Sequence, residues 1–145
     1  MIETISTLLA GLFAGAAVYI ALVEHPARID CGARQAQAEF GASYRRGSVF
    51  MGALLLGGVV SATGAWFISS RIWWLLGGCL LLALIPLTLV AILPINKRLL
   101  ADRPDRDSDQ VLSLLTRWGK WHRVRSLVGF LSFLIFLSLL LSRPR

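Results

Sequence analysis

Four long apolar segments separated by polar connections dominate the pattern of this chain. The apolar runs cover residues 5–23, 49–69, 72–95 and, slightly shorter, 126–142. A run of about 18 or more apolar residues can cross a hydrocarbon core of roughly 30 Å as a helix. Only helices and closed barrels satisfy every backbone hydrogen bond in lipid, so continuous apolar runs predict helices. We predict an all-α protein, a membrane-spanning four-helix bundle with up-and-down topology, forming one domain over residues 1–145.

The first apolar run has a second interpretation, a cleaved signal peptide. The residues before it, Met1 to Glu3, carry no basic charge, and the run exceeds the usual apolar region of a signal peptide. We therefore expect a retained membrane helix. The composition agrees, because 56% hydrophobic and 16% charged residues are unlike an ordinary soluble domain.

The basic residues are distributed unequally between the two ends of the predicted bundle. Twelve of the fifteen lysines and arginines lie in or beside the two long connections: Arg28, Arg34, Arg45, Arg46, Lys97, Arg98, Arg103, Arg106, Arg117, Lys120, Arg123 and Arg125. Only Arg71, Arg143 and Arg145 remain for the other side. Basic residues concentrate on the cytoplasmic side, so we expect both termini outside, in a bacterial inner membrane. The net charge of +7 reflects this topology and anionic lipid, so no nucleic-acid partner is expected.

Small residues and helix breakers predict how the helices pack and bend. Gly11 and Gly15 form a G-x-x-x-G pattern, and a second row with a spacing of four consists of Ala53, Gly57, Ser61 and Ala65. Such rows let helix backbones approach closely in lipid. We expect packing within one bundle, with an oligomer as the alternative. Pro86 predicts a kink in the third span, because proline frees a backbone carbonyl one turn earlier.

The two long connections are predicted to be partly helical. In the first, residues 35–40 are good helix formers, and breaks are predicted on both sides of them, at Gly32 and Gly41. In the second, residues 102–105 predict a turn. Acidic residues that suit a helix N-terminus follow, and then an apolar periodicity typical of a helix. We expect one long fourth helix from about Asp109 to Ser142, extended into the cytoplasm.

Three polar segments should meet at the cytoplasmic end of the bundle. Residues 24–28 close the first span, residues 94–98 close the third, and residues 117–125 precede the fourth. Both histidines of the protein lie in these segments. We expect their rings within roughly 10 Å of each other, about the spacing of packed helices. The side chains predicted to share one cavity are Glu24, His25, Asn96, His122 and Arg125.

The third polar segment, residues 117–125, places Trp118, His122 and Arg125 on one helix face, since they are four and then three residues apart. An amphipathic helix that contacts lipid head groups is the alternative, and it suits Lys120 and Arg123. His122 and Arg125 share the stripe of Trp118, which should face the bundle. Charged groups at membrane depth usually have partners.

The acidic residue of the first segment supplies such a partner. Glu24 would form an ion pair with Arg28, four residues later, or with Arg125. The two cysteines, Cys31 and Cys79, form no C-x-x-C pair, so a thiol oxidoreductase or a thiolate metal cluster is not expected.

Taken in order, the polar motifs resemble the anthrone oxygenase-like family of small four-span membrane proteins. The motifs are Glu24-His25-Pro26-Ala27-Arg28, Ser43-Tyr44-Arg45-Arg46, Pro94-Ile95-Asn96-Lys97-Arg98-Leu99-Leu100, and Arg117-Trp118 with His122 and Arg125. Some members of that family oxidise an anthrone to an anthraquinone with dioxygen. The resemblance implies shared positions at Glu24, His25, Asn96, Trp118, His122 and Arg125.

The chemistry implied by the resemblance suits these side chains. An anthrone has an acidic methylene beside a carbonyl, and His25 or His122 would act as the general base. The other imidazole or Arg125 would hold the developing oxyanion. Asn96, Trp118 and Tyr44 would bind the flat apolar aromatic substrate, which reaches the pocket from the lipid bilayer. No cofactor is expected, because the carbanion would react directly with dioxygen.

Two alternatives remain open at this stage. His25 and His122, from different helices, would ligate a haem iron or copper if a metal is bound. The protein would otherwise be a small membrane bundle without catalytic activity.

Overall fold

The computed structural model describes residues 1–101 and 108–142. In chain order its elements are α1 (Ile2–Tyr19), the π-helix η1 (Ile20–Glu24), α2 (His25–Asp30), α3 (Ala33–Ser69), α4 (Trp73–Leu87), the π-helix η2 (Thr88–Ile92), α5 (Leu93–Leu100) and α6 (Ser108–Leu141). They join into four continuous rods, Ile2–Asp30, Ala33–Ser69, Trp73–Leu100 and Ser108–Leu141, each long and apolar enough to cross a membrane. The chain is an integral membrane protein with the predicted all-α four-helix fold.

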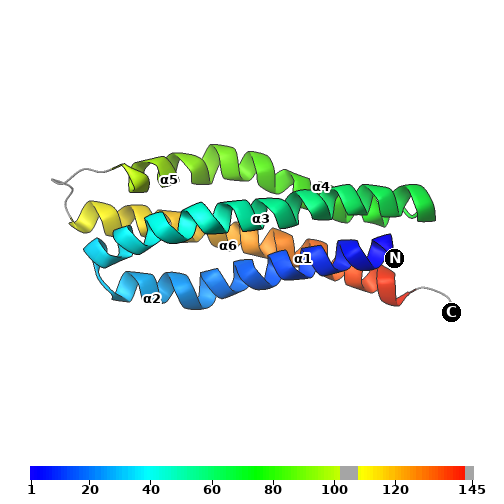
Figure 1. Ribbon diagram of the computed structural model, residues 1–145, viewed down its shortest axis with the longest axis horizontal. Coiled ribbons are helices and arrows are strands. Elements are labelled where there is room, and N and C mark those ends of the chain that lie inside the picture. The colour runs from blue at the N-terminus through cyan, green and yellow to red at the C-terminus, as the bar shows by residue number, and fades with distance from the viewer. Residues whose placement is uncertain (102–107, 143–145) are drawn as a thin grey trace.

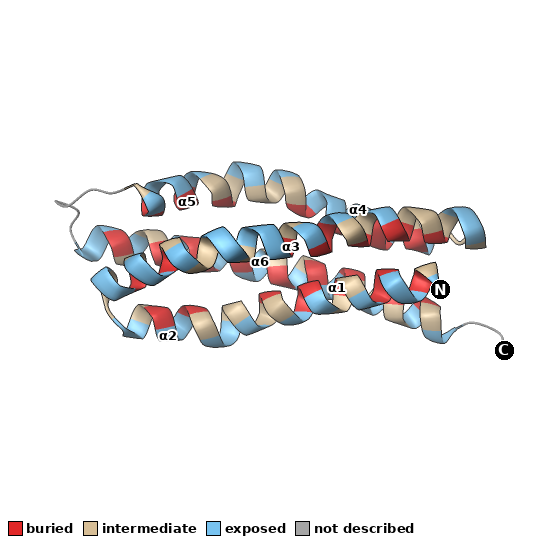
Figure 2. Ribbon diagram, viewed as in Figure 1, coloured by how far each residue is buried: buried red, intermediate tan, exposed pale blue. Residues whose placement is uncertain are grey.

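The rods form a bundle in which neighbours along the chain run in opposite directions (Figure 1). α1 packs against α3 and α6, and α4 packs against the same two helices. Buried residues follow the inner faces of the rods (Figure 2). Large apolar side chains such as Val60 and Phe67 point outward and are each 71% exposed. This apolar exterior suits a lipid environment.

Glycines let aromatic rings fill the bundle interior. A Cβ at Gly77 of α4 would lie 2.3 Å from the Phe136 ring of α6, and one at Gly129 of α6 would lie 2.7 Å from the Phe13 ring of α1. Because lipid provides little hydrophobic drive between helices, such close packing is a main source of stability. These two contacts therefore hold α6 against both of its neighbours.

The predicted rows of small residues pack inside this bundle only in part. Gly11 lies against the Phe133 ring of α6, at 3.0 Å from a built Cβ, and Gly57 lies against Leu9 of α1, at 3.1 Å. Gly15 differs, because a Cβ there meets nothing within 4 Å. Half of the G-x-x-x-G pattern therefore serves helix packing and half does not.

Irregular turns occur at η1 and η2, and the kink expected at Pro86 stays a prediction. α4 continues through Pro86, whereas η1 and η2 end just before Pro26 and Pro94. Each of these prolines lacks the N–H that would bond four residues back. The preceding residues, His25 and Leu93, donate to the carbonyl five residues earlier, which is the π-helical pattern. Both π-helices lie beside the cavity described below.

The connections differ in part from the predictions. α3 is continuous from Ala33, so Gly41 does not interrupt it. The break predicted at Gly32 is confirmed, because the chain turns there with a φ of +85°, in the region that favours glycine. The turn predicted at residues 102–105 lies outside the described residues. The single long fourth helix is confirmed, and it begins at Ser108.

Candidate functional site

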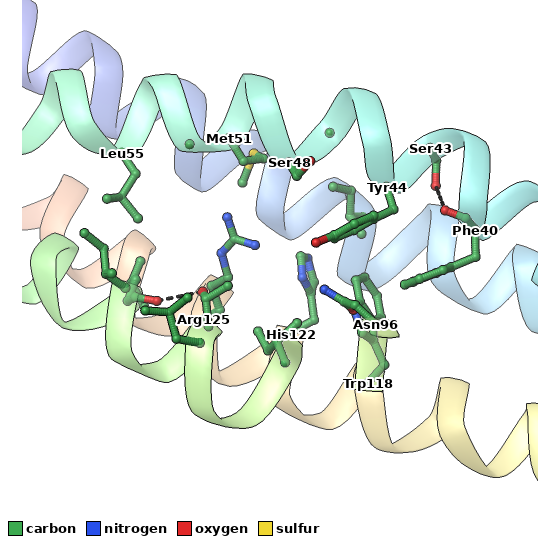
Figure 3. A pocket seen from close by; sticks show the side chains of 18 of the residues that line it. Phe40, Ser43, Tyr44, Ser48, Met51, Leu55, Asn96, Trp118, His122 and Arg125 are labelled. Atoms are coloured by element: carbon green, nitrogen blue, oxygen red, sulfur yellow. Dashed lines mark hydrogen bonds between the residues drawn. The ribbon is translucent and has the colours of Figure 1, made fainter. Parts of the chain in front are cut away.

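A cavity of about 490 Å³ lies inside the bundle, and all four rods contribute to its walls. It separates an apolar core around Phe13 and Phe136 from a second core around Phe40 and Leu115. Its polar wall residues are Glu24, Arg28, Ser43, Tyr44, Ser48, Thr88, Asn96, His122 and Arg125. Figure 3 shows several of these side chains converging on the space between α3 and the helices opposite.

His122 of α6 is the buried imidazole of this cavity, with 2% exposure. Its Nε2 lies 3.2 Å from the carbonyl oxygen of Ala17 in α1. A carbonyl oxygen only accepts, so Nε2 carries the hydrogen in this arrangement. Nδ1 then holds the lone pair, and it is buried without a hydrogen-bond partner among the described residues. The Nδ1 atom of His122, at the wall of the pocket, is therefore available to accept a proton.

Arg125 lies one turn further along α6 and places its guanidinium beside His122. Figure 3 shows this group pointing towards α3, near Met51 and Leu55. It lies over the Phe13 ring, 5.1 Å from the centroid. Among the described residues Arg125 has no carboxylate within ion-pair distance, and its Nε is buried without a hydrogen-bond partner. A cation in such a place is suited to an anionic group of a ligand.

Aromatic rings form one wall of the cavity. The Trp118 indole stacks on the His122 ring, with centroids 4.6 Å apart and an interplanar angle of 11°. Phe40 meets Trp118 edge to face at 5.5 Å and stacks on Tyr44 at 5.9 Å. These rings pack against one another at ordinary aromatic spacings and present flat apolar surface to the cavity.

Two further polar groups reach the same space. Asn96 of α5 is 2% exposed, and its Oδ1 has no hydrogen-bond partner among the described residues. The Tyr44 hydroxyl points towards His122 (Figure 3). Both side chains can therefore hydrogen-bond to a bound molecule.

Arg28 organises the polar end, which we define as the end of the bundle that carries α2 and α5. It forms ion pairs with Glu24 and Glu39 and donates to Ser43 Oγ at 3.1 Å. Its guanidinium also lies 5.8 Å from the Trp118 ring centroid. Of the two ion pairs considered for Glu24, the structure shows the one with Arg28.

His25 does not line the cavity, contrary to the expectation that it shares it with His122. A Cβ built at Gly119 would lie 2.3 Å from its Nε2, so the ring fills the space that Gly119 leaves. The ring centroid is 5.0 Å from that of Trp118. Because both imidazoles lie about 5 Å from the same indole, they are no more than about 10 Å apart. His25 contacts Trp118 and does not reach the pocket space.

Several pocket residues on α3 were not among the predicted site residues. Phe40, Ser43 and Met51 line the cavity from that helix, and the exposed Glu39 beside them forms an ion pair with Arg28. Phe40, Ser43, Gly47 and Met51 follow one another at intervals of three or four residues, which is a helical periodicity. The prediction that a break occurs at Gly41 hid this signal.

Metal ligation by side chains was considered for the two histidines. In the described part of the chain, no group of three or more His, Cys, Asp or Glu residues could hold a metal ion. Cys31 and Cys79 are free and exposed. Among the described residues, ligation of a metal would therefore fall to the two histidines, and the Trp118 ring contacts both of them.

A family model described as anthrone oxygenase matches residues 40–135. The matched segment contains the pocket residues Tyr44, Asn96, Trp118, His122 and Arg125, and Glu24 and His25 precede it. No curated protein and no solved structure matches the chain. Because the family model covers more than half of the chain and agrees with the resemblance in the motifs, the protein belongs to the anthrone oxygenase family.

Proposed function

We propose that the pocket binds a flat apolar aromatic substrate of the anthrone type and oxidises it with dioxygen, with His122 as the general base. The observation that carries the proposal is the buried Nδ1 of His122, which has a lone pair and no partner among the described residues. Arg125 lies next to it and has no carboxylate partner there. A base beside an unpaired cation is the arrangement that removes a proton and stabilises the resulting oxyanion.

The proposed reaction conserves atoms and electrons. His122 Nδ1 takes a proton from the substrate methylene, and the negative charge moves to the carbonyl oxygen beside Arg125. The methylene carbon then bonds to dioxygen, and the proton returns to give a hydroperoxide. Loss of water converts that carbon into a second carbonyl, so one oxygen atom enters the quinone and the other leaves as water. The substrate supplies all four electrons that dioxygen accepts.

The remaining pocket residues have binding roles in this proposal. Trp118 and Tyr44 would stack against the rings of the substrate, and Asn96 would hydrogen-bond to a polar substituent. Arg28 would hold Trp118 in place, because its guanidinium is fixed by two carboxylates and lies over the indole. His25 would support the same indole from its seat against Gly119.

The orientation in the membrane also belongs to the proposal. We place the polar end in the cytoplasm and both termini outside, in a bacterial inner membrane, because most basic residues lie at the polar end. The pocket would then lie on the cytoplasmic side of the bilayer.

Oxygen uptake by the purified protein with a model anthrone tests the proposal. We expect one dioxygen to be consumed for each anthraquinone formed. Arg125→Gln should lower the rate by about 10²–10³-fold, as expected for loss of an oxyanion-stabilising donor. Arg123→Gln is the matched control, because Arg123 is exposed on the same helix, and it should behave like the original protein.

Two results would contradict the proposal. A folded protein without anthrone-dependent oxygen uptake would remove the reaction. Turnover that requires stoichiometric copper or haem, with a matching absorption spectrum, would replace the cofactor-free mechanism by the histidine-ligated metal alternative.

A further inference from the structure

The cavity has its mouth in the side of the bundle, between α3 and η2. Leu56 of α3 and Leu89 of η2 both line the cavity, yet they are 56% and 55% exposed. α3 packs against α4 and α5. All residues of α3 and η2 are described, and η2 packs against α6 but not against α3. The widened turn of η2 thus faces α3 across an opening.

This mouth lies at the depth of the hydrocarbon. Leu56 is about 20 Å along the helix from its end at Ser69, at 1.5 Å per residue. The hydrocarbon core of a bilayer is roughly 30 Å thick. The opening therefore faces lipid tails and not water.

Two glycines of α3, Gly47 and Gly52, line the cavity along the helix from the mouth towards the polar end. A Cβ built at either position meets nothing within 4 Å, in contrast to the glycines that hold α6 in place. Glycine costs about 1 kcal/mol relative to alanine inside a helix, and here packing gives no reason for that cost. The absence of side chains at these two positions leaves open space in the pocket.

The same cavity is lined by buried polar groups that lack hydrogen-bond partners among the described residues. Nδ1 of His122 and Oδ1 of Asn96 belong to side chains that are each 2% exposed, and neither atom has a hydrogen-bond partner among the described residues. A cavity of about 490 Å³ is within the range of roughly 300–1,000 Å³ typical of small-molecule sites. These observations point to a ligand that enters past the glycines.

We propose that Gly47 and Gly52 set the size of the fused ring system that the protein accepts, and that the ligand, a fused-ring aromatic dissolved in the bilayer, enters sideways between α3 and η2. The inference rests on the proposed function for the identity of the substrate class. Binding does not require turnover, so the two ideas can be separated experimentally.

The experiment measures binding of two fluorescent probes to the full chain in lipid nanodiscs. Anthracene has three fused rings and naphthalene has two. We expect Gly52→Leu and Gly47→Leu to weaken anthracene binding by about tenfold or more, and naphthalene binding much less. Gly15→Leu is the matched control, because its Cβ also meets nothing within 4 Å while Gly15 is absent from the cavity wall. Helix content and thermal midpoint should be retained in all three.

The direction of approach is tested with quenchers. A nitroxide at the middle of the lipid tails should quench bound anthracene, and aqueous iodide should not. Quenching by iodide alone would overturn the sideways opening, and anthracene binding by Gly52→Leu and Gly47→Leu equal to that of the original protein would overturn the role of the glycines. Selective loss of binding in the glycine variants, without oxygen uptake by the original protein, would support this inference and contradict only the proposed reaction.

Discussion

Replacing His122 separates its proposed chemistry from its structural contacts. In the original protein, His122 Nε2 lies 3.2 Å from the Ala17 carbonyl oxygen. His122→Gln retains a side-chain N–H that can donate to this oxygen. A hydrogen bond of this kind contributes about 0.5–1.5 kcal/mol net, so stability should change by no more than about that amount. His122→Ala loses this bond and also the stack on Trp118 at 4.6 Å, which adds about 0.5–1.5 kcal/mol.

Activity should follow a different pattern from stability. Loss of a general base typically costs about 10²–10⁴-fold in rate. This corresponds to about 3–5 kcal/mol of transition-state stabilisation, at roughly 1.4 kcal/mol for each factor of ten. Both variants lack the lone pair of Nδ1, so both should lose activity to a similar extent although His122→Ala is the less stable.

The assay combines oxygen uptake at saturating anthrone with the thermal midpoint of the same preparation. Lys120→Gln is the control, because Lys120 is an exposed residue of the same helix. Activity of His122→Gln within a few-fold of the original protein would refute the role as base. The role as base would also be refuted if His122→Ala lost much more activity than His122→Gln, in parallel with its greater loss of stability. Loss of bound metal or haem in both variants would assign His122 to ligation.

Two further predictions concern the seat of His25 and the orientation of the chain. Gly119→Ala should destabilise the protein by about 1–3 kcal/mol, because its Cβ would lie 2.3 Å from His25 Nε2. Combining it with His25→Ala should recover most of the loss in thermal midpoint. Unchanged stability of the single variant would show that the His25 ring is not held against Gly119. In a background without native cysteines, a cysteine placed beside Arg71 should react with an impermeant reagent from outside, and one beside Arg98 should not; the reverse pattern would place the polar end outside.

The sequence alone was sufficient to predict the four spans and the face of α6 that carries the site. Lipid offers no partner for backbone groups, so long apolar runs must be helices regardless of what they pack against. The positions of Trp118, His122 and Arg125 follow from helical periodicity in one continuous element, which requires no knowledge of neighbouring helices.

Only the tertiary structure decided which polar side chains share the cavity. His25 and Glu24 are adjacent in sequence, yet Glu24 lines the pocket while His25 fits against Gly119. The break at Gly32 was predicted from the sequence, but the pairing of Arg28 with Glu39 of α3 depends on how that helix packs against α2 after the turn.

The shape of the cavity is likewise a tertiary property. The Phe136 ring fills the space beside Gly77, whereas nothing fills the space beside Gly52. The sequence alone does not distinguish these two helical glycines. The difference depends on side chains from other helices and on the π-helical turn of η2, since the width of a cavity is set by all of its walls together.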